Sequence, residues 1–143
     1  MRKKPKISNL DTWFLSEKII ENNFIERGFL TLNPLAEAGV VDLVLYKNKK
    51  FVKLQVKTAI FSKKENRFSV SLYGSGRRQY KKNDFDYYVF YLYEVDTIYI
   101  VPLKILLNKV HAHFYPTRNT RVGSGTLEKY KNAYSQLDKW NYL

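Results

Sequence analysis

Cysteine is absent from this 143-residue chain, which excludes a disulfide scaffold, a cysteine-ligated zinc site and a cysteine nucleophile. No apolar run reaches the ~18–20 residues that a membrane-spanning helix needs. The basic residues 1–6 are not followed by the continuous apolar segment of a secretory signal. We therefore expect an intracellular protein, in the cytoplasm or the nucleoid, with no membrane partner.

Acidic residues are scarce: 13 Asp and Glu stand against 25 Lys and Arg, for a formal charge of +12. This imbalance favours a polyanionic partner such as nucleic acid, although a basic protein that is merely soluble is the alternative. Hydrophobic residues make up 45% of the chain, enough for a core, and the length fits one domain over residues 1–143. In such a basic domain the few carboxylates are the first candidates for chemistry.

The pattern of apolar residues predicts an α/β protein with a mixed central β-sheet flanked by helices. Residues 87–93 are apolar at every position, which is typical of a central strand covered on both faces. Thr126 is the expected cap of the last helix, whose apolar residues Leu127, Tyr130, Tyr134 and Leu137 form one stripe. The expected helices span residues 8–26, 103–110 and 127–142, and the expected strands 29–32, 40–46, 51–59, 67–73, 87–93 and 98–101.

The hairpin of residues 40–57 carries the candidate chemistry. Apolar and polar residues alternate along both strands, so Val41, Leu43 and Leu45 are expected on the core side. A two-residue turn at positions 48 and 49 then places Asp42 opposite Gln55, and Lys57 lies on the same face as Gln55. The hydrophobic pattern itself fixes this register.

Such a trio can assist phosphodiester cleavage. A carboxylate and an amide oxygen are hard ligands of the kind Mg²⁺ prefers, and a nearby lysine can hold a phosphate oxygen or help a metal-bound water lose its proton. The structural alternative is a cross-strand hydrogen bond between Asp42 and Gln55 beside a solvated Lys57. Spacing alone leaves both interpretations open.

The segments 39–45 and 54–59 resemble the core of the PD-(D/E)XK nuclease superfamily. Asp42 matches the first acid of that motif and Lys57 matches its lysine, whereas Gln55 stands where the motif has Asp or Glu. Glu17 is similar to the helical glutamate of many of these nucleases, with Glu21 as the competing candidate. The resemblance spans roughly residues 8–103 and is closest to a Gln-x-Lys variant found in small homing endonucleases encoded in group I introns.

The resemblance implies a restriction-endonuclease-like fold and Mg²⁺-dependent, site-specific cleavage of double-stranded DNA, with Mn²⁺ as a substitute metal. It implies that Asp42, the Gln55 side chain and the Val56 carbonyl bind the metal, that Glu17 assists and that Lys57 supports the attacking water. Because one small domain supplies one active site, cutting both strands calls for a homodimer or homotetramer. The alternatives are a Holliday-junction resolvase or repair nuclease, and a catalytically inactive DNA-binding protein that retains the nuclease fold.

Two basic segments are candidates for DNA contacts, with a solvated charged loop as the alternative. Lysines 47, 49 and 50, at the hairpin tip, are better placed for the DNA backbone than for bases. His111 and His113 have no obvious third metal ligand, so we expect ordinary surface or packing histidines rather than a zinc site. The DNA-contact candidates are Arg77, Arg78, Lys81, Lys82, Arg118, Asn119 and Arg121.

Overall fold

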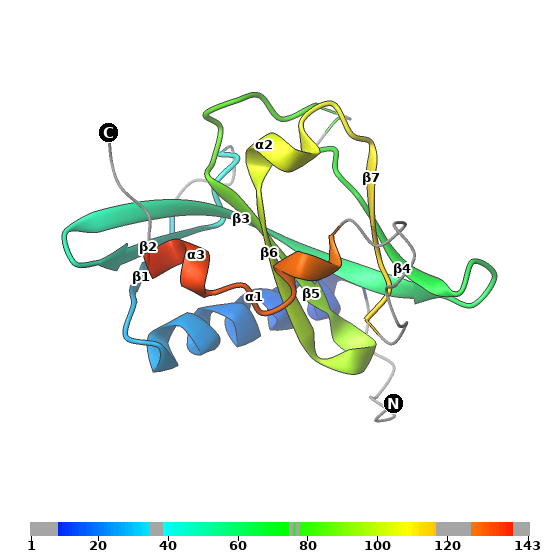
Figure 1. The fold of residues 1–143 in the computed structure, drawn as a ribbon, viewed down its shortest axis with the longest axis horizontal. Helices are drawn as coiled ribbons and strands as arrows, with labels where there is room; N and C mark the ends of the chain where they lie inside the picture. The colour runs from blue at the N-terminus through cyan, green and yellow to red at the C-terminus, as the bar shows by residue number, and fades with distance from the viewer. Residues whose placement is uncertain (1–8, 35–38, 75, 77, 117–126, 139–143) are drawn as a thin grey trace.

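The computed structural model describes residues 9–34, 39–74, 76, 78–116 and 127–138. Within these ranges the chain forms a seven-stranded mixed sheet, with helix α1 against one face (Figure 1). None of the helices described there is both long and apolar enough to cross a membrane. The elements are α1 (Asn9–Glu26), β1 (Leu30–Leu32), β2 (Leu43–Lys47), β3 (Lys50–Ser62), β4 (Arg67–Ser71), β5 (Tyr87–Leu92), η2 (Tyr93–Val95), β6 (Thr97–Pro102), α2 (Leu103–Leu106), β7 (His111–Phe114), η3 (Glu128–Tyr130) and α3 (Ser135–Asp138).

Helix α1 buries one stripe of its surface. Ile20 and Phe24 are fully buried against the sheet, whereas Trp13 and Phe14 are 44% and 57% exposed. Gly28 follows with a φ of 88°, a backbone conformation that glycine adopts at little cost at a helix end. The helix expected from the sequence over residues 8–26 is confirmed from Asn9 onward.

The β2–β3 hairpin has the predicted register. Leu43 pairs with Leu54, and Lys47 pairs with Lys50 across a two-residue turn. Asn48 and Lys49 in this turn have φ values of 53° and 63°, the geometry of a type I′ turn that matches the twist of the strands. The hairpin therefore sets the position of every residue along the first half of β3.

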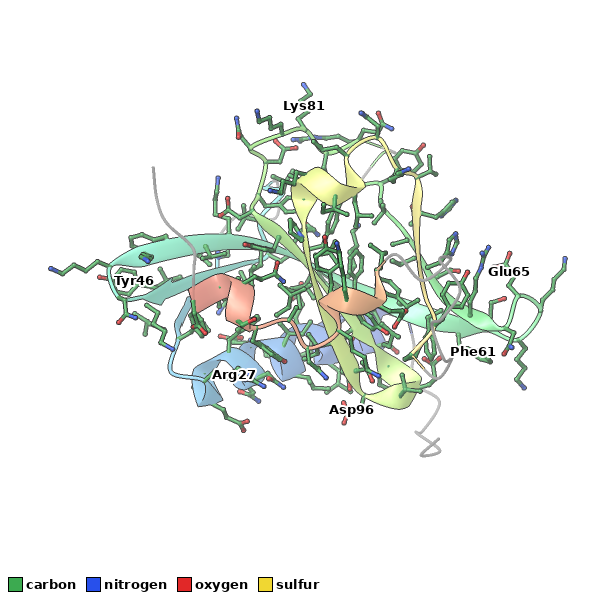
Figure 2. The ribbon with its side chains drawn as sticks, viewed as in Figure 1. Arg27, Tyr46, Phe61, Glu65, Lys81 and Asp96 are labelled. Atoms are coloured by element: carbon green, nitrogen blue, oxygen red, sulfur yellow. The ribbon has the colours of Figure 1, made fainter. Side chains whose placement is uncertain are left out.

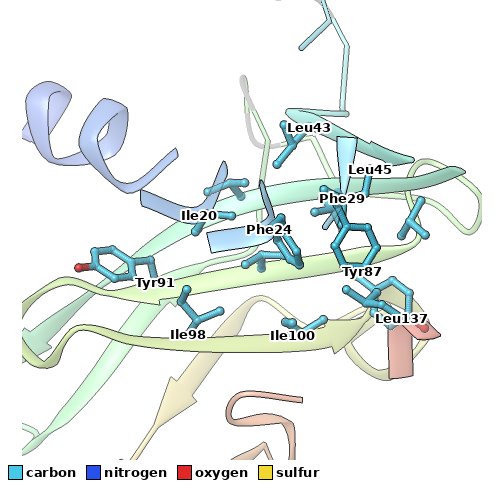
Figure 3. Close-up of a cluster of buried hydrophobic side chains, with 14 residues drawn as sticks. Ile20, Phe24, Phe29, Leu43, Leu45, Tyr87, Tyr91, Ile98, Ile100 and Leu137 are labelled. Atoms are coloured by element: carbon cyan, nitrogen blue, oxygen red, sulfur yellow. The ribbon is translucent and has the colours of Figure 1, made fainter. Parts of the chain in front are cut away.

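Strand β5 is central, as expected: it pairs in parallel with β3 and antiparallel with β6. All six of its residues are buried. Tyr87, Val89 and Tyr91 belong to the first core, under α1 (Figure 3). The alternate residues face a second core that includes Phe68, Phe114 and residues of α2. Two cores, one on each face, explain why this strand shows no polar alternation.

Val41 does not share a face with Leu43 and Leu45, so that expectation is wrong. Leu43 and Leu45 are buried in the first core, whereas Val41 packs against the second. Strand β2 begins only at Leu43. The period-two pattern holds within the strand and does not extend to the residues before it.

A continuous helix over residues 127–142 is also wrong within the described residues. The segment forms the short elements η3 and α3, because Asn132 has a φ of 52° and Lys131 makes a β-bridge with Tyr99. Leu127 packs against the second core and Leu137 against the first, so the apolar residues do not form one stripe. Thr126 and residues 139–142 lie outside the described ranges.

Strand β7 was not expected from the sequence. Residues 103–110 were predicted as a helix, but α2 ends at Leu106. β7 then pairs antiparallel with β4 at the end of the sheet. Ala112 and Phe114 are buried and alternate with His111 and His113, a short alternation that could have indicated a strand.

Candidate active site

Asp42 lies directly before strand β2, and its side chain extends the pairing with β3. Its backbone N–H donates to the Leu54 carbonyl at 2.8 Å. Its Oδ2 then accepts hydrogen bonds from the Val56 N–H at 2.9 Å and from Gln55 Nε2 at 2.7 Å. The carboxylate oxygen thus takes the place of a backbone carbonyl in the next hydrogen bond to β3. Asp42 and Gln55 meet as the register predicts.

These hydrogen bonds leave oxygen atoms for another ligand. Oδ1 of Asp42 and Oε1 of Gln55 take no part in them. The carbonyl of Val56 faces the same edge of β3 as that of Leu54, because the edge toward which backbone groups point alternates along a strand. It accepts one long hydrogen bond, from Gln55 Nε2 at 3.5 Å. Burial raises the pKa of Asp42, and hydrogen bonds and Lys57 only partly offset it. A cation there would relieve this cost.

The donor set fits a hard divalent cation with several water ligands. It offers one carboxylate oxygen, one amide oxygen and one backbone carbonyl, all of the type that Mg²⁺ accepts. Among the described residues, no three His, Asp or Glu side chains come together as a metal-binding group. The arrangement therefore suits an ion that keeps much of its hydration shell, and not an all-protein cage.

Lys57 extends from β3 next to this set. Its Nζ donates to the Tyr73 carbonyl at 3.0 Å and lies 5.4 Å from the centroid of the Tyr80 ring. Burial lowers the pKa of Lys57, and the negative charge of Asp42 opposes that shift. The ammonium group is therefore within electrostatic reach of Asp42.

Helix α1 contributes two glutamates whose pKa values are shifted in opposite directions. Burial, and secondarily the charge of Asp42, raises the pKa of Glu17 to about 7. Although burial raises the pKa of Glu21, hydrogen bonds from Asn33, Thr31 and Lys18 bring it below its ordinary value. The Thr31 hydroxyl and the Asn33 amide each donate to Glu21 Oε1 at 3.0 Å. Glu17 is thus coupled to Asp42, and Glu21 is tied to the segment around β1.

The basic loop between β4 and β5 lies close to the same face of β3. Lys53 Nζ, two residues before Gln55, donates to the Asn83 carbonyl at 3.4 Å. Arg78 forms an ion pair with Asp84 at 3.8 Å. Lys81 and Lys82 are exposed, and Figure 2 shows Lys81 at the top of the view, on this loop.

The other DNA-contact candidates lie outside the described residues: Arg77, Arg118, Asn119 and Arg121.

The remaining polar candidates have ordinary contacts. Lys47 Nζ donates to the Arg27 carbonyl at 3.2 Å and lies over the Phe29 ring, so it turns toward the protein body. His113 Nδ1 lies 2.9 Å from the Ser69 hydroxyl, and the rings of His111 and His113 are 6.2 Å apart. His111 is exposed and His113 half-buried, in agreement with ordinary surface and packing histidines.

Two residues near the site were missed in the sequence. Tyr73 and Tyr80 contact the ammonium of Lys57, the first through its carbonyl and the second through its ring. No spacing rule connects a loop residue to a strand residue this far back in the chain. Only the fold brings them together.

Solved structures define the fold. The structure of a bacterial homing endonuclease, I-Ssp6803I, matches with a TM-score of 0.83 over 93% of this chain and 95% of that one. The two are 22% identical, so the match shows a shared fold. The predicted restriction-endonuclease-like architecture is confirmed.

Sequence comparisons give the family. The family model described as PD-(D/E)XK endonuclease matches residues 15–133, and the chain belongs to that family. Protein 5.3 of Escherichia phage T7 is 37% identical over 73 residues, which cover 50% of this chain and 62% of that protein. The chain thus spans less than two thirds of that relative's length.

Proposed function

We propose that this family member is a Mg²⁺-dependent endonuclease that cuts both strands of DNA at a specific site, in the manner of a homing endonuclease. The observation that carries the proposal is the group directly before β2: Asp42 is held against Gln55 and Val56, and Lys57 and Glu17 are both electrostatically coupled to it. Besides the cross-strand hydrogen bond, a second carboxyl group and an ammonium group are thus electrostatically coupled to Asp42.

In this proposal Asp42 Oδ1, Gln55 Oε1 and the Val56 carbonyl hold Mg²⁺, or Mn²⁺ in its place. The bound ion would polarise a phosphate oxygen and lower the pKa of an attacking water. Gln55 contributes no charge, so the affinity for metal is lower than with a second carboxylate. Its amide N–H orients Asp42 instead.

Lys57 and Glu17 would each assist the reaction at the phosphate. The Lys57 ammonium stabilises negative charge on a non-bridging phosphate oxygen and favours loss of a proton from the attacking water. Glu17, with a pKa of about 7, accepts or returns a proton near neutral pH. Its pKa matches that task better than the lowered pKa of Glu21 does.

Double-stranded DNA is the proposed partner. The formal charge of +12 and the exposed Lys81 and Lys82 near the site support phosphate contacts. Arg77, Arg78, Arg118, Asn119 and Arg121 remain proposed contacts. Because one domain carries one such site, cleavage of both strands requires a homodimer or homotetramer.

The proposal is tested by incubating the protein with a duplex DNA library and Mg²⁺ and sequencing the ends produced. Recurrent ends in both strands are expected, and EDTA should abolish them. Preference for a four-way junction over a linear duplex would instead indicate a junction resolvase. Binding without nicking, even with Mn²⁺, would indicate an inactive nuclease fold. Gln55 would then mark the loss of activity.

A further inference from the structure

The ammonium group of Lys57 contacts two residues of the loop after β4. Its Nζ donates to the Tyr73 carbonyl at 3.0 Å, and the Tyr80 ring lies on another side, with its centroid 5.4 Å from Nζ. An aromatic face at this distance attracts a cation through its quadrupole. Two groups of different chemistry therefore restrict one flexible side chain.

The Tyr80 ring is itself held in place by the second core. It packs edge-on against Phe85 at 5.1 Å and against Tyr88 at 6.0 Å between ring centroids. Phe85 and Tyr88 are almost fully buried. Burial raises the pKa of the Tyr80 phenol, so the ring remains neutral at physiological pH. The face that Lys57 meets is thus fixed by buried neighbours.

Gly74 allows the ring to lie this close to the loop. A Cβ added at Gly74 would come 3.1 Å from Tyr80 Oη and 3.3 Å from its Cε1 and Cζ. Gly74 is not among the glycines with positive φ, so the missing side chain, and not the backbone conformation, is what matters. Its N–H donates to the Arg78 carbonyl at 2.8 Å, which closes the loop.

We propose that Tyr80 is a positioning residue for Lys57: its ring face and the Tyr73 carbonyl together fix the Lys57 ammonium within electrostatic reach of Asp42. A lysine carries a compact charge on a flexible four-carbon stem, and a misplacement of ~1 Å in a reacting group can cost ~10²-fold in rate. This inference rests on the proposed function, since it assigns Lys57 a task at the phosphate. Tyr80 acts through Lys57 and not on DNA.

The first experiment compares Tyr80→Leu with Tyr80→Phe in single-turnover DNA cleavage. Tyr80→Leu should slow cleavage about tenfold and change the Kd for DNA, measured with Ca²⁺, by less than about twofold. Tyr80→Phe keeps the ring face and should restore the rate to within about twofold. Tyr134→Leu is the matched control, because Tyr134 also has a cation over its ring, Arg27 at 3.5 Å, in a groove lined by Asn23 and Asp96.

A second measurement does not depend on activity. The ring current of Tyr80 should shift the ε-CH₂ protons of Lys57 upfield in NMR spectra of protein with ¹³C-labelled lysine, the signal being assigned by its loss in Lys57→Met. The upfield shift should persist in Tyr80→Phe and disappear in Tyr80→Leu. If Tyr80→Leu does not fold, Gly74→Ala replaces it, because its Cβ would crowd the Tyr80 ring at 3.1–3.3 Å and should reduce both the shift and the rate in part.

The two hypotheses fail in different ways. If the wild-type protein binds DNA but never cleaves it, the proposed function fails, whereas the NMR signal still tests the contact. If the wild type cleaves DNA and Tyr80→Leu or Gly74→Ala does so at the same rate with an unchanged Lys57 signal, Tyr80 does not position Lys57. A loss of rate equal in Tyr80→Leu and Tyr80→Phe would also overturn the inference.

Discussion

Two aspartates each bind strand β3 through both their backbone N–H and their carboxylate, on opposite edges of the strand. Asp42 donates its N–H to the Leu54 carbonyl at 2.8 Å and accepts the Val56 N–H at 2.9 Å. Asp86 donates its N–H to the Lys53 carbonyl at 2.9 Å and accepts the Lys53 N–H at 2.8 Å. Burial raises the pKa of both carboxyl groups. As structural elements, the two aspartates are close equivalents.

Their side-chain neighbours differ. Asp42 has the amide of Gln55 at 2.7 Å and is electrostatically coupled to Lys57 and Glu17. The charge that acts on Asp86 is that of Lys53, whose ammonium bonds to a backbone carbonyl of the basic loop. An aspartate directly before a strand, hydrogen-bonded to β3, therefore occurs twice in this fold and does not by itself define a site. What distinguishes the candidate site is the second carboxyl group and the ammonium beside it.

The largest expected difference is between Asp42→Asn and Asp86→Asn. Both variants keep an oxygen that accepts the β3 N–H, so both should fold. Asp42→Asn removes the charged oxygen proposed to hold Mg²⁺ and should reduce single-turnover cleavage about 10³-fold, with DNA binding retained. Asp86→Asn should stay within about threefold of the wild type. Equal rates for the two variants would remove the distinction between these aspartates.

The next comparison is between the two lysines on the same face of β3. Lys57→Ala removes a half-buried ammonium coupled to Asp42 and should slow cleavage about 10²-fold. Lys53→Ala removes an ammonium that contacts the Asn83 carbonyl and should change cleavage by less than about threefold. The single-turnover rate at saturating DNA checks both. If Lys53→Ala has the larger effect, the reactive phosphate lies nearer the basic loop than we propose.

Gln55→Glu gives Asp42 a second carboxylate as its neighbour, as the family motif has. Without metal, the 2.7 Å hydrogen bond becomes a repulsive contact, which should cost about 2 kcal/mol of stability, or about 5 °C in Tm. Mg²⁺ should restore the Tm, and cleavage should be kept or increased. Gln79→Glu, at an exposed position, is the control for added charge. A Gln55→Glu protein that is stable in EDTA but inactive would give the amide a role beyond orienting Asp42.

The hairpin and the central strand could be predicted from the sequence because independent constraints agreed there. Alternation and turn length in β2–β3 both required the same register, and Asn48 suited a positive φ. Strand β5 is apolar on both faces because it separates two cores. Asp42 and Gln55 followed from that register alone. Local pattern was sufficient for the register of the hairpin, whose two strands follow each other in the chain.

The rest depended on contacts between distant segments. The helical spacing after residue 126 is overruled by Asn132, whose N–H donates to the Ile98 carbonyl at 2.9 Å with a positive φ. The choice between Glu17 and Glu21 depends on which one β1 engages, through Thr31 and Asn33. The residue pattern along α1 does not show which of the two glutamates these side chains bind.

The smallest expected effects concern the pH dependence of stability. The pKa of Glu17 is raised from 4.5 to about 7, so between these values the folded protein binds a proton that the unfolded chain releases. The free energy of unfolding therefore decreases as pH rises through this window. Glu17→Gln should remove that decrease and, in EDTA, stabilise the protein above pH 7 by about 1 kcal/mol, a figure reduced for solvent screening.

Glu21→Gln should act in the opposite direction. The pKa of Glu21 is lowered. Its carboxylate therefore stabilises the fold at pH values above its ordinary pKa, and that contribution is lost as the pH falls. Glu21→Gln should therefore lower stability at neutral pH and have little effect in acid. Urea unfolding across pH 4–8 distinguishes the two variants. The two glutamates lie one helical turn apart, so opposite signs would reflect their surroundings: burial and then the charge of Asp42 for Glu17, and the hydrogen bonds from Asn33 and Thr31 for Glu21. Equal signs would contradict the raised pKa of Glu17.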